Sequence, residues 1–227
     1  MTKIKARARK ILSALEKAYP EANCTLDFRN PFQLLISTIL SAQATDVSVN
    51  KVTPMLFAKF PDAESFADAK ESKIRNCIRS IGLYKTKAQN IRNACRIIME
   101  LHNGKVPATM KELTELPGVG RKTANIVLGN AFGKAEGIAV DTHVTRLSGR
   151  LGLSAEKDYN KIEKDLMRLF PSTKWVEISH MLIAHGRKVC PARSPKCGEC
   201  VLRKSCPSAF AFEKKGGKAK AIKQVYG

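Results

Sequence analysis

Apolar residues recur at the spacing of an amphipathic helix along most of this 227-residue chain. The clearest example follows Asn30 and Pro31, a pair typical of a helix N-cap followed by a proline in the first turn. Behind this pair the apolar positions follow i, i+3, i+4, i+7 and i+8, at Phe32, Leu35, Ile36, Ile39 and Leu40. Because no pair of alternating strand segments with a hairpin signal is found, the sequence predicts an all-α fold with this helix near its centre.

The same periodicity predicts helices along the rest of the chain. The N-terminal segment has one apolar face that ends before Pro20 and contains Ile4, Ile11, Leu12, Leu15 and Tyr19. Further helices are expected over residues 46–60, 71–80, 86–102, 109–115, 121–132, 142–151, 158–169 and 174–187. The glycine-containing break at 133–137 is the best candidate for a crossing between two domains.

A glycine-rich turn interrupts the helices at residues 116–122, which read Leu-Pro-Gly-Val-Gly-Arg-Lys. Glycine permits positive φ and close approach to the backbone, and N–H groups that meet at a helix start form an anion site. The alternative is an ordinary turn in which Gly118 ends one helix. Lys122 favours a functional role, because a cation in a first helical turn opposes the helix dipole.

The charge balance favours a polyanionic partner. Forty Lys and Arg residues oppose 20 Asp and Glu residues, which gives a net charge of +20. For a chain without membrane segments, nucleic acid is the leading candidate, and a generically basic protein is the alternative. The last 21 residues contain five lysines and one glutamate, so most of the charge belongs to the folded part. Residues 211–227 are expected to form a basic, disordered tail.

The N-terminal segment and the cysteine content suggest an intracellular, soluble protein. The chain begins with a charged segment that lacks the apolar region of a secretory signal. No apolar run approaches the roughly 20 residues that a membrane-spanning helix needs. Seven cysteines, an odd number, argue against a disulfide scaffold. In a bacterium, the expected location is the cytoplasm or nucleoid.

Four of these cysteines are clustered near the C-terminus. Cys190, Cys197, Cys200 and Cys206 form a C-x6-C-x2-C-x5-C pattern within 17 residues. The prolines and the scarcity of apolar residues indicate a loop, which a bound metal would order. Tetrahedral zinc and an iron–sulfur cluster both take four cysteines, and spacing alone leaves the two open. The other three cysteines are expected to pack as small hydrophobes: Cys24, Cys77 and Cys95.

An ordered set of motifs resembles the endonuclease III family of helix-hairpin-helix DNA glycosylases. The set consists of residues 116–124, Val-Asp-Thr-His at 140–143, and the four-cysteine loop. Ser-Ala-Gln-Ala-Thr-Asp at 41–46 and Ile-Gly-Leu-Tyr at 81–84 are also similar to segments of that family. The resemblance extends from about residue 20 to residue 206.

The resemblance implies two helical domains with a DNA-binding cleft between them. A helical barrel domain with the hairpin would span 22–133, and a cluster domain would combine 1–21 with 134–210. It also implies a 4Fe-4S cluster, rather than zinc, on the four clustered cysteines. The expected partner of this monomer is double-stranded DNA that contains damaged pyrimidines or abasic sites.

The resemblance further implies a bifunctional glycosylase and lyase. Lys122 would attack C1′ of the flipped nucleotide and form a Schiff base, after which β-elimination cuts the strand. A helix N-terminus, the adjacent Arg121 and partial burial would each disfavour the ammonium form. The alternative for Lys122 is a simple phosphate contact. Asp141 would stabilise charge on the sugar or move a proton, although on local sequence it is also a good helix N-cap.

Other residues are implied to bind DNA. Gln43 and Leu83 would fill the gap that base flipping leaves, although Leu83 also fits the apolar contact of a helix end. Asp46 is a candidate for the base pocket or, alternatively, a helix-initiating residue. His143 would contact phosphate or serve a helix start, whereas His180 and His185 are assigned to structure. The hairpin would hold a phosphate through Gly118, Val119, Gly120 and Arg121.

Two other classes of protein fit part of the pattern. A mismatch-specific glycosylase of the same superfamily shares the cysteine loop. The adenine-mispair type is disfavoured by Lys122 and by the 21 residues after Cys206, too few for its extra domain, whereas the thymine-mismatch type stays open. The second class is a non-catalytic DNA-binding or redox module on the same fold. The joint presence of Lys122 and Asp141 argues against that class, because binding alone requires neither.

Overall fold

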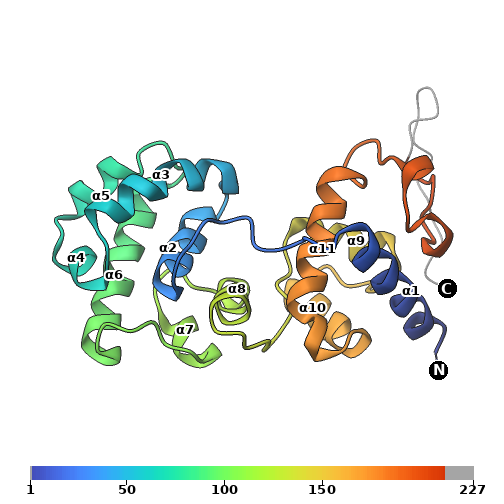
Figure 1. Cartoon of the computed structure of the whole chain (residues 1–227), viewed down its shortest axis with the longest axis horizontal. Helices are drawn as coiled ribbons and strands as arrows, with labels where there is room; N and C mark the ends of the chain where they lie inside the picture. Colours follow the sequence, from blue (N-terminus) through green and yellow to red (C-terminus); the bar gives the residue numbers. More distant parts are fainter. Residues whose placement is uncertain (1, 213–227) are drawn as a thin grey trace. The chain divides into compact units, whose positions relative to one another are not determined.

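A computed structural model describes residues 2–212 of the chain. This range contains eleven α-helices, three short 3-10 helices and no strand, which confirms the all-α prediction (Figure 1). Most of the expected basic tail, from residue 213 onward, lies outside the described residues. None of the helices within 2–212 is long and apolar enough to cross a membrane.

The chain divides into two compact units, and each has its own apolar core. One unit is continuous and spans Cys24–Glu136. Its helices are α2 (Pro31–Ser41), α3 (Asp46–Lys59), α4 (Ala63–Asp68), α5 (Glu71–Cys77), α6 (Tyr84–His102), α7 (Met110–Glu115) and α8 (Arg121–Ala131). We call it the hairpin unit, because α7, the glycine turn and α8 belong to it.

The second unit combines the chain up to Asn23 with the chain from Gly137 onward. Its helices are α1 (Lys3–Ala18), α9 (Thr142–Arg150), α10 (Tyr159–Leu169), α11 (Trp175–Lys188), and the 3-10 helices η1 (Ser172–Lys174), η2 (Cys197–Glu199) and η3 (Arg203–Ser205). We call it the cysteine unit. Helix α11 contacts α1 and α9 (Figure 1), and the Ser179 hydroxyl on α11 donates to the Ala139 carbonyl at 2.7 Å.

Helix α2 is the central element of the hairpin unit, as its periodicity predicted. Asn30 caps it, since its side-chain oxygen accepts a hydrogen bond from the Gln33 N–H at 2.9 Å. All residues from Leu34 to Leu40 are buried, and the helix packs against α3, α6 and α8. A helix that is buried all round provides a rigid base for the loops at its ends.

Helix α4 is the one α-helix within residues 2–212 that the periodicity missed. It has only six residues, too few for an apolar repeat to show. Its local signal is a capping box: the Asp62 side chain accepts from the Ser65 N–H, and the Ser65 hydroxyl in return accepts from the Asp62 N–H. Packing of Phe66 into the core then stabilises the short helix.

Candidate functional site

The glycine turn between α7 and α8 has the geometry of a tight anion-binding hairpin. Gly118 has φ of +80°, and a Cβ added there would lie 3.0 Å from Nδ2 of Asn90 on α6. Glycine is therefore required at this position both by backbone conformation and by space. Val119 is buried, and its N–H donates to the Leu116 carbonyl at 3.0 Å, so the valine anchors the turn in the core.

Gly120 leaves the start of α8 open. It is the N-cap of the helix, and no side chain caps the first-turn N–H groups. An added Cβ would meet nothing within 4 Å, so the backbone here is accessible from outside. Uncapped N–H groups at a helix N-terminus attract anions, and a phosphate group fits this requirement.

Lys122 is the second residue of α8 and its side chain is exposed. The partial burial expected from the sequence is wrong, because the first turn of α8 faces outward. Within residues 2–212, the Lys122 ammonium makes no ion pair or hydrogen bond, whereas the adjacent Arg121 does interact with a neighbour. The amine is thus accessible beside an open helix start.

Gln43 and Leu83 lie in two adjacent loops of the hairpin unit. Both adopt the left-handed backbone conformation that non-glycine residues rarely take, with φ of 54° and 59°. Both side chains are exposed, and Leu83 exposes 57% of its surface. The alternative interpretation of Leu83 as the apolar contact of a helix end is therefore wrong. An added Cβ at Gly82 would lie 3.7 Å from the Gln43 carbonyl oxygen, so the loops touch.

Asp46 occupies a helix start. It is the first residue of α3, behind the N-cap Thr45, and its Oδ2 accepts a hydrogen bond from the Thr25 hydroxyl at 2.5 Å. This position matches the helix-initiating alternative. The side chain is half-buried, and a role in recognising a base stays a prediction.

Asp141 is the N-cap of α9 in the cysteine unit. Its Oδ1 accepts a hydrogen bond from the Val144 N–H at 2.8 Å, as the local sequence predicted. Its other oxygen, Oδ2, accepts no hydrogen bond from the described part of the chain. The carboxylate is half-buried. One oxygen therefore serves the helix while the second is available for chemistry.

His143, two residues later, is held by Arg146. Its Nδ1 lies 3.0 Å from an Arg146 guanidinium nitrogen, and the same guanidinium donates to the carbonyls of Gly186 and Cys190. An added Cβ at Gly186 would lie 3.0 Å from both side chains, so the packing is close. Burial and the nearby Arg150 lower the pKa of Arg146 below its usual value. Arg146 thus joins α9 to the end of α11, and His143 is held beside it.

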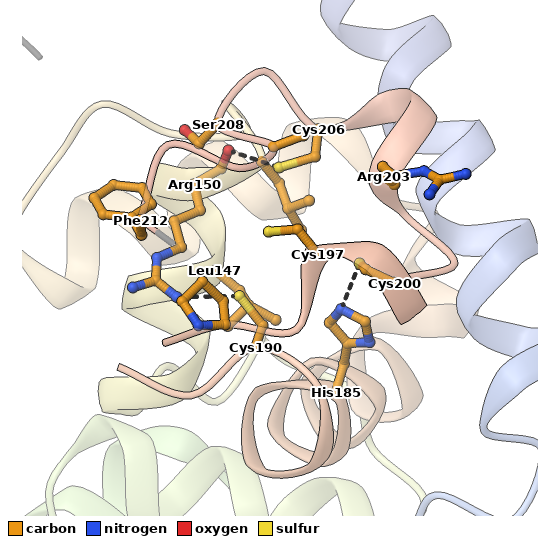
Figure 2. Close-up of a pocket in the computed structure, with 13 residues that line it drawn as sticks. Leu147, Arg150, His185, Cys190, Cys197, Cys200, Arg203, Cys206, Ser208 and Phe212 are labelled. Carbon is orange, nitrogen blue, oxygen red and sulfur yellow. Dashed lines mark hydrogen bonds between the residues drawn. The ribbon is translucent and has the colours of Figure 1, made fainter. Parts of the chain in front are cut away.

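The four clustered cysteines surround one cavity, as Figure 2 shows. The cavity volume is about 30 Å3, and α9, α11 and the loop after α11 supply its walls. Within residues 2–212, no three His, Cys, Asp or Glu side chains form a group that holds a single metal ion. The cavity is lined by Cys190, Cys197, Cys200 and Cys206, together with Leu147, Arg150, Leu151, His185, Pro195, Arg203, Ser208, Ala209 and Phe212.

Side-chain nitrogen atoms face two of these sulfur atoms. An Arg150 guanidinium nitrogen donates to Sγ of Cys190 at 3.2 Å, and Nε2 of His185 lies 3.3 Å from Sγ of Cys200. Burial raises the pKa of the Cys200 and Cys206 thiols, with the other thiols adding to the effect. Donors aimed at sulfur stabilise thiolates, which are the form that binds metal.

Sequence reasoning missed two of the side chains that hold the cysteine loop. Arg150 donates to the carbonyls of Pro191 and Ala192 at 2.8 and 2.9 Å, and its guanidinium lies 4.4 Å from the centroid of the Phe212 ring. His185 was assigned to structure without its contact to Cys200. No local pattern signals these contacts, because the partners of Arg150 are 41 and 42 residues away.

The remaining cysteines behave as predicted. Cys77 and Cys95 are buried in the core of the hairpin unit, and Cys24 packs against that core. Burial raises the pKa of the Cys95 thiol to about 12, so this thiol is unreactive. None of the seven cysteines forms a disulfide bond.

Comparison with known proteins gives one consistent family. The model of the HhH-GPD superfamily base excision DNA repair proteins matches residues 36–172. The chain is 54% identical over 211 residues to the endonuclease III of Synechocystis sp., covering 93% of this chain and 96% of that protein. It is 44% identical over 202 residues to the endonuclease III of Escherichia coli strain K12, covering 89% and 95%.

Solved structures agree with these sequence matches. A trapped endonuclease III–DNA covalent intermediate has a TM-score of 0.87 and 44% identity, covering 92% of this chain and 98% of that chain. A thermostable thymine-DNA glycosylase has a TM-score of 0.79 and 26% identity, covering 89% and 96%. Similarity to both structures extends over nearly the whole chain.

Proposed function

The chain belongs to the HhH-GPD superfamily of base excision DNA repair proteins, and we propose that Lys122 is the nucleophile of its reaction. The protein is a DNA glycosylase and abasic-site lyase of base excision repair, and its partner is double-stranded DNA. As substrates we propose DNA with oxidised or otherwise damaged pyrimidines, together with abasic sites. The observation that carries this proposal is the exposed, unpaired Lys122 amine at the open N-terminus of α8.

The proposed reaction uses the neutral amine of Lys122. The amine attacks C1′ of a nucleotide flipped out of the duplex and the base leaves, so a C–N bond forms as the glycosidic bond breaks. The sugar then opens to a Schiff base on Lys122. Loss of a proton from C2′ eliminates the 3′ phosphate and cuts the strand.

We propose that the glycine turn holds a phosphate near the lesion. The uncapped N–H groups after Gly120 and the positive φ of Gly118 support this role, since they expose backbone donors to an anion. Arg121 would add charge at the same place. These contacts position the protein without reading sequence. Binding should therefore weaken steeply as salt concentration rises.

Gln43 and Leu83 would enter the duplex in place of the flipped nucleotide. Two exposed side chains on touching loops, each held in a strained backbone conformation, support this assignment. Strain of this kind persists only where the surrounding structure imposes it and is concentrated at functional sites. An exposed leucine inserted between bases would regain the apolar environment that it lacks in water.

Asp141 would assist the same reaction while it caps α9. Its free Oδ2 would stabilise cationic charge on the sugar or accept a proton. His143, held by Arg146, would contact phosphate from the following turn. Asp46 would face the flipped base beside its bond to Thr25. These three assignments follow the family resemblance residue by residue.

We propose a 4Fe-4S cluster on Cys190, Cys197, Cys200 and Cys206. Four thiols that line a single cavity, with donors facing two of them, fit a group several atoms wide. When bound, the cluster would order the loop after α11 and supply a redox-active centre. Arg150 and His185 would stabilise the thiolates through their hydrogen bonds to sulfur. Iron and sulfide in equal stoichiometry, four of each per chain, would support this assignment, whereas stoichiometric zinc would overturn it.

A thymine-mismatch glycosylase is the second candidate. The thermostable thymine-DNA glycosylase, with a TM-score of 0.79, is the observation that favours it. Single-turnover rates on otherwise identical duplexes separate the two. An oxidised pyrimidine should be excised faster than a mismatched thymine, and the reverse order would support the second candidate.

Borohydride trapping tests the nucleophile. Duplex DNA with one damaged pyrimidine is incubated with the protein and reductant, which converts a Schiff base into a stable amine. We expect a covalent adduct with the wild-type protein and none with Lys122→Ala. Tight DNA binding with neither adduct nor cleavage would instead indicate a non-catalytic module. Arg193→Ala, an exposed cation of the cysteine loop, is the matched control and should still form the adduct.

A further inference from the structure

Lys87 on α6 is a buried lysine whose ammonium contacts no acidic side chain. The residue exposes only 4% of its surface, and Nζ donates to the carbonyl oxygen of Leu40 at 2.8 Å. Desolvation lowers the pKa of Lys87. Burial of a cation costs free energy, so its presence here indicates that the contacts it makes are needed. An apolar residue of similar length would fill this space without that cost.

The first of these contacts fixes the end of α2. Leu40 is the penultimate residue of that helix, so its carbonyl is among the last four that lack an intrahelical partner. The neighbouring carbonyl of Ser41 accepts from the Ala44 N–H at 3.0 Å. Lys87 supplies the donor for the Leu40 carbonyl, and its positive charge interacts favourably with the negative end of the helix dipole. Gln43 follows three residues after Leu40.

The second contact fixes the start of α6. The backbone N–H of Lys87 donates to the carbonyl of Leu83 at 3.0 Å and forms the first helical hydrogen bond after that residue. Lys87 is therefore bonded through its backbone to the Leu83 loop and through its side chain to the helix that leads into Gln43. One residue joins both exposed, left-handed positions.

Helix α6 extends this connection to the glycine turn. Leu83, Lys87 and Asn90 follow i, i+4 and i+7, which places them along one face of the helix. The Asn90 side chain lies against Gly118, where an added Cβ would be 3.0 Å from its amide nitrogen. The face thus carries, in order, the loop tip, the buried lysine and the contact to the hairpin.

We propose that Lys87 is a positioning residue that holds Gln43 and Leu83 at the register needed to fill the gap in the duplex. The inference rests on the proposed function, in which these two side chains enter the DNA. Lys87 touches no DNA itself. It fixes two strained loops relative to each other and, through α6, relative to the phosphate-binding turn. Loss of the ammonium would leave the Lys122 chemistry intact but uncouple it from duplex opening.

Helix α6 also provides a matched control. Arg92 lies five residues after Lys87, and its Nε donates to the carbonyl of Ala69, the C-cap of α4, at 2.9 Å. This is the same kind of bond, from a cation on α6 to a carbonyl at a helix end, but it lies away from both loops. Arg92→Met and Lys87→Met therefore remove equivalent bonds, and only the second is expected to affect DNA opening.

The experiment measures opening and chemistry separately in the full-length protein. Opening is read from the fluorescence of 2-aminopurine placed opposite a tetrahydrofuran abasic analogue in a duplex, because the base brightens when it unstacks. Chemistry is read as single-turnover cleavage of an abasic site in duplex and in single-stranded DNA. We expect Lys87→Met to lose most of the fluorescence rise and about tenfold in duplex cleavage, with single-strand cleavage unchanged.

The controls separate this inference from the proposed function. Arg92→Met should match the wild-type protein in both assays, and Lys87→Arg, which keeps the cation, should recover about half of the duplex rate. Should Lys87→Met not fold, Lys87→Gln enters the same assays with the same expectation. Wild-type fluorescence and duplex cleavage in the lysine variants would overturn the inference. If the wild-type protein cleaved neither the duplex nor the single-stranded DNA, the proposed function would instead be overturned.

Discussion

The hydroxyl of Tyr19, the C-cap of α1, lies 2.8 Å from Nδ1 of His185 on α11. The opposite ring nitrogen, Nε2, lies 3.3 Å from Sγ of Cys200. Burial lowers the pKa of His185 to about 4, so the ring is neutral at pH 7 and carries one N–H. A thiolate on Cys200 is best stabilised when Nε2 carries that proton and Nδ1 accepts from Tyr19. The tyrosine thereby selects the histidine tautomer that supports the cysteine centre.

Tyr19→Phe should weaken this centre without unfolding the protein. The variant loses the hydroxyl that fixes the His185 tautomer, and we expect a loss of about 1 kcal/mol in unfolding free energy. Visible absorbance should also bleach faster than in the wild-type protein during incubation with an iron chelator. Tyr159→Phe is the control, because Tyr159 belongs to the same unit but exposes 51% of its surface. Equal bleaching rates in both variants would contradict the proposed role of Tyr19.

Asp141 can be separated into its two roles by paired substitutions. Asn caps helices about as well as Asp, so Asp141→Asn should keep the unfolding free energy within a few tenths of a kcal/mol. It removes the charge on Oδ2, and we expect single-turnover base excision to fall about 100-fold. Asp141→Ala should lose both excision and about 1 kcal/mol of stability.

Asp158 provides the control for this pair, because it caps α10 in the same unit through the Lys161 N–H. Asp158→Ala should lose similar stability and keep full excision activity. If Asp141→Asn retained wild-type excision, Asp141 would be a cap alone.

Acid should destabilise the protein partly through His180. Burial lowers the pKa of His180 from 6.5, so below that pH the unfolded state binds more protons than the folded state. This contribution is absent above pH 6.5 and costs stability as the pH falls below it, with a slope of at most about 1.4 kcal/mol per pH unit. His185, whose pKa is also lowered, adds a slope of the same sign.

His180→Gln should flatten this dependence. We expect its unfolding free energy in urea to fall less steeply than that of the wild-type protein between about pH 6.5 and about pH 5. His102 on α6 is half-buried, and His102→Gln serves as the comparison. Parallel curves for the wild-type protein and His180→Gln would show that the folded state accepts the charged ring.

The two glycines of the turn should respond differently to alanine. Gly118→Ala combines positive φ with a clash at Asn90 and should lose about 1–2 kcal/mol of stability. Gly120→Ala meets no atom within 4 Å and should stay within about 0.5 kcal/mol of the wild-type value. Urea unfolding measures both changes.

A double variant isolates the steric part of the Gly118 effect. Asn90→Ala clears the space beside residue 118, so Gly118→Ala should cost less in that background than in the wild-type protein. The remaining loss would report the backbone conformation alone. An identical cost in both backgrounds would mean that Asn90 already moves aside.

Local signals predicted the helices and the chemistry of the hairpin. Asn30 and the periodic apolar residues behind it are sufficient to define α2, and the glycines before Lys122 define the start of α8. The periodicity did not predict helix α4, because six residues are too few to display a period. The sequence also did not predict the exposure of Lys122, since burial depends on how distant segments pack.

Contacts between a side chain and a distant carbonyl could not be predicted. Lys87 reaches Leu40 across 47 residues, and Arg146 reaches Cys190 across 44. In a single sequence, such a cation looks like any other basic residue of a strongly basic chain. Only the fold shows that these two cations satisfy carbonyls at helix ends and loops.

Removal of iron should affect one unit and leave the other intact. The cysteine loop has few buried apolar side chains apart from Leu202, so bound metal supplies much of its ordering energy. The hairpin unit has a separate core in which α2, α6 and α8 pack together.

After chelation, amide hydrogen exchange should accelerate by about 100-fold or more across residues 190–206. Protection in α2 and α6 should not change. Arg150, whose hydrogen bonds to the Pro191 and Ala192 carbonyls involve protein atoms alone, should keep the first part of the loop partly protected. Equal acceleration in both units would show that the metal stabilises the whole protein, and the two cores would then not be independent.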